Sequence, residues 1–197
     1  LLILMFVFVL ASSGLNAGQQ SSERCVRFSL PDSILKKPFY FAGELIPLQR
    51  PDVQGRVTSQ VNFLLLDARS VLTDWLMERA KFSWLFAEIL AKEGVPTDLT
   101  LLSPVISGSS LKSTFRPNGT GWWALDKPCS STEGIELVDD SWHDDRADLE
   151  LSTRCFAAKL KKIRADLGEC GWIMSLAAYI TSPKTIQEYC DKWKTTY

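Results

Sequence analysis

The sequence holds a single histidine, His143, and no Cys-x-x-Cys pair among its 197 residues. Because zinc and similar ions take most of their protein ligands from histidine and cysteine, no metal site is expected. The chain also lacks a glycine-rich phosphate loop and the Gly-x-Ser-x-Gly elbow of α/β-type serine hydrolases, so neither a nucleotide-dependent enzyme nor that hydrolase class is favoured, and no cofactor is expected.

An excess of basic residues is absent as well. The 22 lysines and arginines oppose 23 aspartates and glutamates, which gives a formal net charge of −1. A protein that binds nucleic acid usually carries a strong positive excess, so nucleic acid is not expected as a partner. At 46% hydrophobic and 23% charged residues, the composition is instead that of one packed globular domain.

The chain begins with an uninterrupted apolar run over residues 1–10, followed by small residues as far as Ala17. This pattern is typical of the hydrophobic and cleavage regions of a secretory signal peptide, and it predicts cleavage after Ala17. No methionine or basic region precedes the run, which predicts a chain trimmed at its front. The alternative is a buried core helix, because ten residues are too few to span a bilayer. Export predicts a periplasmic or secreted protein whose mature chain has no stable membrane span.

The predicted export bears on the five cysteines, because an exported protein can form disulfides. An odd number leaves at least one thiol free or paired between chains. We expect one or two disulfides within the region from Cys129 to Cys190, although Cys155 and Cys190 also suit an apolar helix face. The cysteines are Cys25, Cys129, Cys155, Cys170 and Cys190.

Hydrophobic spacing predicts an all-α, or α-dominant, domain over residues 57–197. Gly94 and Gly168 are expected to end helices. Residues 18–56 are predicted to form an irregular N-terminal arm, since their four prolines interrupt helix and central strand alike. The expected helices cover residues 57–78, 81–93, 97–107, 149–167, 171–181 and 184–194.

Five aspartates cluster over residues 139–148. The cluster lacks the alternating ligands and the glycine of a calcium-binding EF-hand loop. A solvated loop is therefore the favoured interpretation. The aspartates are Asp139, Asp140, Asp144, Asp145 and Asp148.

Four short motifs occur in an order that suggests a family. They are Gly94–Leu102 (GVPTDLTLL), Gly121–Trp123 (GWW), Asp144–Asp148 (DDRAD) and Leu176–Tyr179 (LAAY), and the segment Gly43–Leu48 (GELIPL) precedes them. Together they resemble the lysozyme-like lytic transglycosylases, the SLT family, in particular the membrane-bound murein transglycosylase D type, over roughly Ala42 to Ile186. The resemblance implies a lysozyme-like helical fold that acts on the glycan strands of peptidoglycan. It also implies that the third motif precedes a helix and that Asp148 caps the start of that helix.

In that family one glutamate, at the end of the helix after the first motif, acts as the only catalytic acid and base. The matching position here is Ile106, or Ser107 in an alternative register, and no aspartate or glutamate occurs from Leu99 to Leu125. Cleavage of a glycosidic bond needs a carboxyl group that protonates the leaving oxygen. The family's glutamine after the tryptophan motif is Ala124 here, and its Asn-x-Gly after the tyrosine is Ile180–Ser182. These replacements predict a chain that has lost glycan cleavage.

The resemblance places Trp123 and Tyr179 in the sugar groove, with Ser107 beside it, as substrate-binding residues; the alternative is that both rings belong to the core. The expected function is binding of peptidoglycan glycan, or scaffolding of envelope components, without cleavage. A second hypothesis is an active enzyme that takes a displaced carboxylate from the segment Glu133–Asp148. A third is a module that binds a protein partner in the cell envelope.

Overall fold

The computed structural model describes residues 29–107, 119–126, 129, 134–140, 142–168 and 170–193. Helices dominate these residues, which confirms the predicted fold class. The expected signal peptide and Cys25 lie outside the described residues. The elements are α2 (Asp32–Leu35), β1 (Phe39–Phe41), β2 (Glu44–Ile46), α3 (Pro51–Asn62), the π-helical turn η1 (Phe63–Asp67), α4 (Arg69–Lys92), the 3₁₀ helices η2 (Thr97–Leu102) and η4 (Asp145–Ala147), α5 (Ser103–Ser107), α6 (Leu149–Asp166), α7 (Trp172–Ile180) and α8 (Pro183–Trp193).

The segment expected to be an irregular arm contains regular structure, so that prediction is wrong for much of its described part. Strands β1 and β2 pair antiparallel, with Tyr40 opposite Leu45. Their turn places Ala42 at φ 51° and Gly43 at φ 79°, the positive angles that a two-residue hairpin turn requires. The four prolines that suggested irregularity fall outside the strands, at residues 31, 38, 47 and 51, and the last of them begins α3, where a missing N–H costs nothing. Phe41, Ile46 and Leu48 are buried in the same core as the later helices.

The break between the first two long helices differs from the predicted one. We expected helices over 57–78 and 81–93, but α4 runs from residue 69 to residue 92 and the interruption lies at residues 63–68. There the chain makes a π-helical turn, with the N–H of Ala68 bonded to the carbonyl of Phe63 at 2.9 Å. No glycine or proline marks this turn, so the sequence carries no signal for it.

The segment 97–107 was expected to be one α-helix, and the structure divides it. Residues 97–102 form the 3₁₀ helix η2, and α5 follows from Ser103. Pro104 lies in the first turn of α5, where proline is tolerated. Gly94 ends α4 at φ 70°, as predicted.

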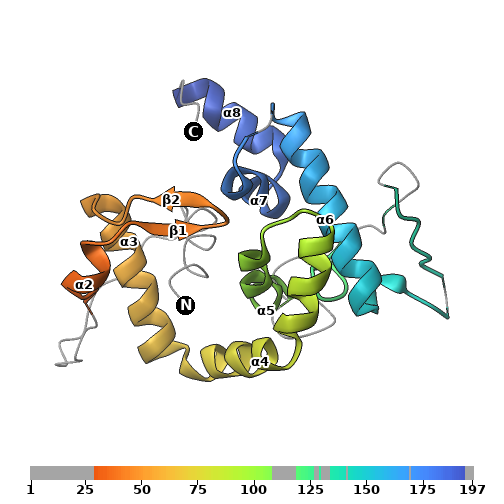
Figure 1. Ribbon diagram of the computed structural model, residues 1–197, viewed down its shortest axis with the longest axis horizontal. Coiled ribbons are helices and arrows are strands. Elements are labelled where there is room, and N and C mark those ends of the chain that lie inside the picture. The colour runs from red at the N-terminus through yellow and green to blue at the C-terminus, as the bar shows by residue number, and fades with distance from the viewer. Residues whose placement is uncertain are drawn as a thin grey trace.

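In the last third of the chain, the observed helices agree closely with those predicted from the sequence. The carboxylate of Asp148 accepts a hydrogen bond from the N–H of Leu151 at 2.8 Å and caps α6, as predicted. Gly168 follows α6 at φ 76°. Helix α7 packs against α6 and α8 and is largely buried, and α8 extends to one side of this pair (Figure 1).

One hydrophobic core links the hairpin to α7. The disulfide Cys129–Cys155 ties the segment before the acidic cluster to α6, which confirms the expectation of a disulfide within the Cys129–Cys190 region. Cys170 is a free thiol. Among the described residues, no helix has both the length and the hydropathy that crossing a bilayer requires.

Candidate functional site

Trp123, expected to stack on sugar, lies in the centre of the core with 0% of its surface exposed. One face of its ring stacks on Phe156, with the centroids 4.0 Å apart and the planes 8° from parallel. Its indole N–H donates a hydrogen bond to the hydroxyl of Thr153 at 2.8 Å. Both the ring and its polar atom are therefore satisfied within the protein, and in this structure the ring acts as a core residue.

Tyr179 lies beside Trp123, so the structure brings these two predicted site residues together. The hydroxyl of Tyr179 donates to the backbone carbonyl of Trp123 at 2.7 Å, and its ring meets the edge of Phe156 at 5.1 Å between centroids. Only 5% of the Tyr179 surface is exposed. The contact between the two motifs thus runs through the protein interior rather than across an open groove.

A small part of Tyr179 nonetheless borders the surface. It lines an open depression of about 330 Å³ between the end of α6 and the start of α8. Acidic, basic and hydroxyl side chains surround this depression, among them Asp126, Lys159, Asp166 and Thr181. Groups of this kind form hydrogen bonds with polar ligands such as sugar hydroxyls.

Ile106, which the resemblance aligns with the catalytic glutamate of the lytic transglycosylases, is 2% exposed and belongs to the hydrophobic core. Ser107, the alternative position, is also buried, and its hydroxyl has no hydrogen-bond partner among the described residues. One turn earlier, the hydroxyl of Ser103 donates to the carbonyl of Trp122 at 2.9 Å, which joins this helix to the tryptophan motif. Neither position places a carboxyl group in a cleft.

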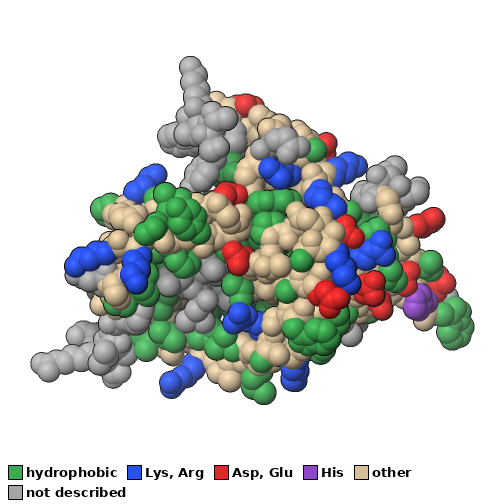
Figure 2. Space-filling view, in the orientation of Figure 1, with side chains coloured by type: hydrophobic (Ala, Val, Ile, Leu, Met, Phe, Trp, Pro, Cys, Tyr) green, Lys and Arg blue, Asp and Glu red, His purple; other side chains and the backbone are tan. Residues whose placement is uncertain are grey.

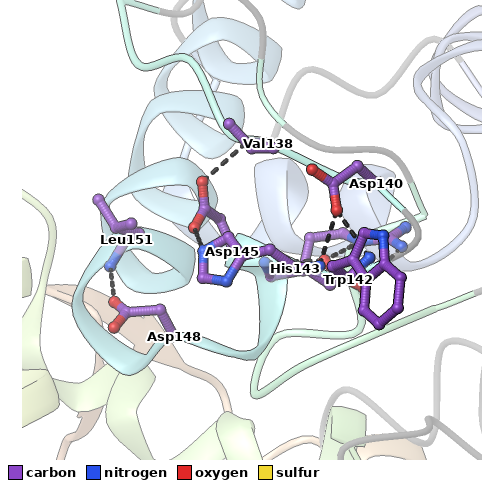
Figure 3. A network of polar contacts seen from close by, with 9 residues as sticks. Val138, Asp140, Trp142, His143, Asp145, Asp148 and Leu151 are labelled. Atoms are coloured by element: carbon purple, nitrogen blue, oxygen red, sulfur yellow. Dashed lines mark hydrogen bonds and ion pairs between the residues drawn. The ribbon is translucent and has the colours of Figure 1, made fainter.

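The acidic cluster was expected to be a solvated loop, and that expectation is wrong for its central members (Figure 3). Arg146 lies almost buried among the aspartates and bonds to Asp144 at 2.8 Å and to Asp139 at 2.9 Å. The carboxylate of Asp145 is buried too, where it accepts a hydrogen bond from the N–H of Val138 at 2.7 Å and contacts the ring of His143. The family-like Asp-Asp-Arg sequence is therefore the centre of a polar network that holds the segment before α6.

These contacts stabilise the charged form of the acids. The side-chain hydrogen bond from Arg146 is the main cause that lowers the pKa of Asp144. The backbone N–H groups of Trp142 and His143 lower the pKa of Asp140. A general acid in glycoside cleavage needs the opposite, a raised pKa that keeps its proton near neutral pH. The hypothesis of a displaced catalytic carboxylate from this segment therefore gains no support from Asp140 or Asp144, and Glu133 lies outside the described residues.

A second depression, of about 380 Å³, lies where α4 ends against α6. Glu93 borders it and bonds to Lys161 at 3.0 Å and to Arg154 at 3.3 Å. Burial alone would raise the pKa of Glu93, but the two cations outweigh it and the pKa is lowered. This carboxylate also lacks the raised pKa of a general acid.

Within the described part of the chain, no group of three or more potential metal ligands occurs.

Sequence reasoning missed Arg146, His143 and Thr153. Arg146 had a partial signal, because an arginine two residues after an aspartate can bind it within a short turn, as Arg146 binds Asp144, but its second partner Asp139 lies farther back in the sequence. Thr153 had none, since its partner Trp123 lies 30 residues away.

Comparison with protein-family models, with curated proteins and with solved structures finds no match to this chain.

Proposed function

We propose that this chain is an exported, non-catalytic domain of lytic transglycosylase descent that binds the glycan strands of peptidoglycan without cleaving them. The observation that carries the proposal is the buried isoleucine at position 106, where the resembled family has its only catalytic acid. Replacing that glutamate by a core side chain removes the proton donor and keeps the helix packed.

The binding part of the proposal draws on the depression that Tyr179 lines. It contains the end of the LAAY motif and the following Thr181 and Ser182, which correspond to the segment of the family that contacts sugar. Both charges and hydroxyls border it, and the depression is open to solvent. The proposed contact is therefore made by polar side chains at the depression and not by stacking on the buried Trp123.

Sedimentation of the purified protein with isolated peptidoglycan tests this proposal. We expect the wild-type chain to co-sediment and Asp166→Ala to bind about tenfold more weakly, since a hydrogen bond to a charged group contributes about 1.5 kcal/mol or more. Asp166 is exposed at the depression. Asp74→Ala is the matched control, because Asp74 is an exposed aspartate on α4 that does not line the depression. Absence of co-sedimentation by the wild-type chain would overturn the proposal.

A further inference from the structure

Trp142 is the most exposed of the large hydrophobic side chains that the structure describes. It is 95% exposed, whereas the next tryptophan, Trp84 on α4, is 65% exposed. The indole forms no hydrogen bond or ring contact with any other described residue, and it extends away from the polar network (Figure 3). The ring therefore contributes nothing visible to the packing of the fold.

The backbone that carries Trp142 is, in contrast, firmly held. Asp139 and Asp144 pair across the turn, and the N–H of Asp140 donates to the carbonyl of His143 at 2.8 Å. The carboxylate of Asp140 accepts from the N–H groups of Trp142 at 2.7 Å and of His143 at 2.8 Å. A large apolar ring is thus presented to solvent from a backbone that these hydrogen bonds hold in place, which lowers the entropy cost of a contact with a partner.

The charge around the ring indicates the kind of partner. Residues 134–148 hold six carboxylates and a single basic side chain, Arg146, in a protein whose overall net charge is −1. Two of the carboxylates, those of Glu136 and Asp140, belong to exposed residues on the same segment as Trp142, and a third exposed one, that of Asp139, is paired with Arg146. Acidic side chains lie near the histidine at this end of the molecule, and basic side chains occupy the neighbouring surface (Figure 2). Such a surface repels anionic lipids and polyanions and attracts cations.

An exposed indole ring also favours a cationic partner. The face of a tryptophan ring attracts lysine and arginine side chains, and tryptophan is the best of the aromatic residues in this respect. Tryptophan is also enriched at the centres of protein interfaces, where one ring can supply a large part of the binding energy. The indole ring and the negative charge of the segment therefore both favour a partner rich in lysine or arginine.

We propose that Trp142, together with the exposed carboxylates of Glu136 and Asp140 on the same segment, is a docking surface for a lysine- or arginine-rich segment of another protein. In the complex the Trp142 ring packs on a cationic side chain, and the exposed carboxylates beside it pair with neighbouring cations. This surface is separate from the depression that Tyr179 lines, so its partner does not depend on the proposed binding of glycan.

A fluorescein-labelled hexaarginine peptide, titrated with the full chain, is the probe. We expect saturable binding that Trp142→Ala weakens about tenfold, in keeping with loss of a desolvated cation–π contact. Raising the salt concentration from 50 to 500 mM should weaken it further, because screening reduces the attraction between exposed charges. Trp84→Ala is the matched control and should bind as the wild type does. Asp140→Ala, which removes the acceptor that orders the turn, should also weaken binding.

Equal affinity of Trp142→Ala and wild type for the peptide would overturn the proposal. So would a Trp142-dependent affinity for an N-acetylglucosamine oligomer in the absence of any affinity for hexaarginine, which would identify the ring as a sugar platform. Because Trp142 has no packing role among the described residues, the variant should keep the wild-type thermal transition, and a loss of binding would not report on folding.

Discussion

Trp123 shows what a single residue can and cannot reveal from its position in the sequence. The motifs around Trp123 and Tyr179 predict that the two rings lie near each other, and they do. Whether the rings face a groove or the core depends on Phe156 and Thr153, which occupy both the stacking face and the indole N–H. Those partners come from α6, and nothing in the local spacing identifies them.

Replacing Trp123 separates these two roles. We expect Trp123→Ala to lower the free energy of unfolding by about 3–5 kcal/mol, because it opens a cavity in the core. Trp84→Ala, at an exposed site, should change it by less than about 1 kcal/mol. Urea denaturation followed by circular dichroism measures both. A Trp123→Ala protein of wild-type stability that no longer binds peptidoglycan would show that the ring serves the sugar.

Residue 106 offers a pH-dependent test of its burial. In Ile106→Glu, burial should raise the pKa of the new carboxyl group above its value in the unfolded chain. A raised pKa favours the protonated form in the folded state, so the variant should be most stable below about pH 4 and lose stability as pH rises through the folded-state pKa. The loss is about 1.4 kcal/mol for each unit by which the pKa is raised.

Ile106→Gln is the matched control, since a glutamine side chain has nearly the same size as a glutamate side chain and does not titrate. The difference in unfolding free energy between the glutamate and glutamine variants, measured by urea denaturation from pH 4 to pH 7, should grow with pH. Parallel pH profiles for the two variants would mean that the carboxyl group at this position is solvated and that position 106 opens onto a cleft.

At the scale of the elements, helices with a regular apolar stripe and a recognisable cap could be predicted closely. α6 begins after its predicted cap at Asp148, and Gly94 and Gly168 follow their helices as expected. Elements whose geometry depends on distant contacts could not be predicted from the sequence. The carboxylate of Asp98 accepts from the N–H of Ala42 at 3.0 Å, which helps fix the hairpin turn across 56 positions in sequence. The hairpin did have a local signal, an Ala-Gly turn between two short apolar strands, which the neighbouring prolines concealed.

The hairpin also reaches the N-terminus of α7. The carboxylate of Glu44 on β2 accepts from the N–H of Ile173 at 3.2 Å. A Cβ added at Gly171 would lie 2.6 Å from the carboxyl carbon of Glu44, so glycine at this position permits the approach. An anionic group near the first turn of a helix is stabilised by the unpaired N–H groups and the dipole there.

A double-mutant cycle on this contact has a defined outcome. Glu44→Ala should cost about 1 kcal/mol of unfolding free energy. Gly171→Ala should cost a similar amount, because its methyl group displaces the carboxylate. In the Glu44→Ala background the same glycine substitution should cost close to nothing. Costs that simply add in the double variant, measured by urea denaturation, would show that the contact does not couple hairpin and helix.

At the scale of the whole molecule, two features reinforce each other. The disulfide closes a loop of 26 residues between Cys129 and Cys155 that contains the acidic segment, and a closed loop of this length contributes about 3 kcal/mol in the chain-entropy model. Within the same loop Arg146 pairs with Asp144, and Asp148 caps the start of α6. Trp142 is therefore displayed from a segment that is fixed at both ends.

The proposed absence of glycan cleavage is a claim about the whole molecule. The resembled family needs one glutamate for both proton transfers, and the described part of the chain offers a buried isoleucine at that place. The pKa values of Glu93, Asp140 and Asp144 are lowered by their partners. Since a general acid contributes on the order of 10²–10⁴-fold to a typical reaction, its absence should abolish measurable turnover.

The most direct test is to incubate the wild-type chain with isolated peptidoglycan and to measure soluble anhydro-muropeptides by mass spectrometry. We predict co-sedimentation with the polymer and no release of anhydro-muropeptides above a buffer control. Clear release by the unmutated chain, abolished by replacing an acid between Glu133 and Asp148, would contradict the account and identify the protein as an active enzyme.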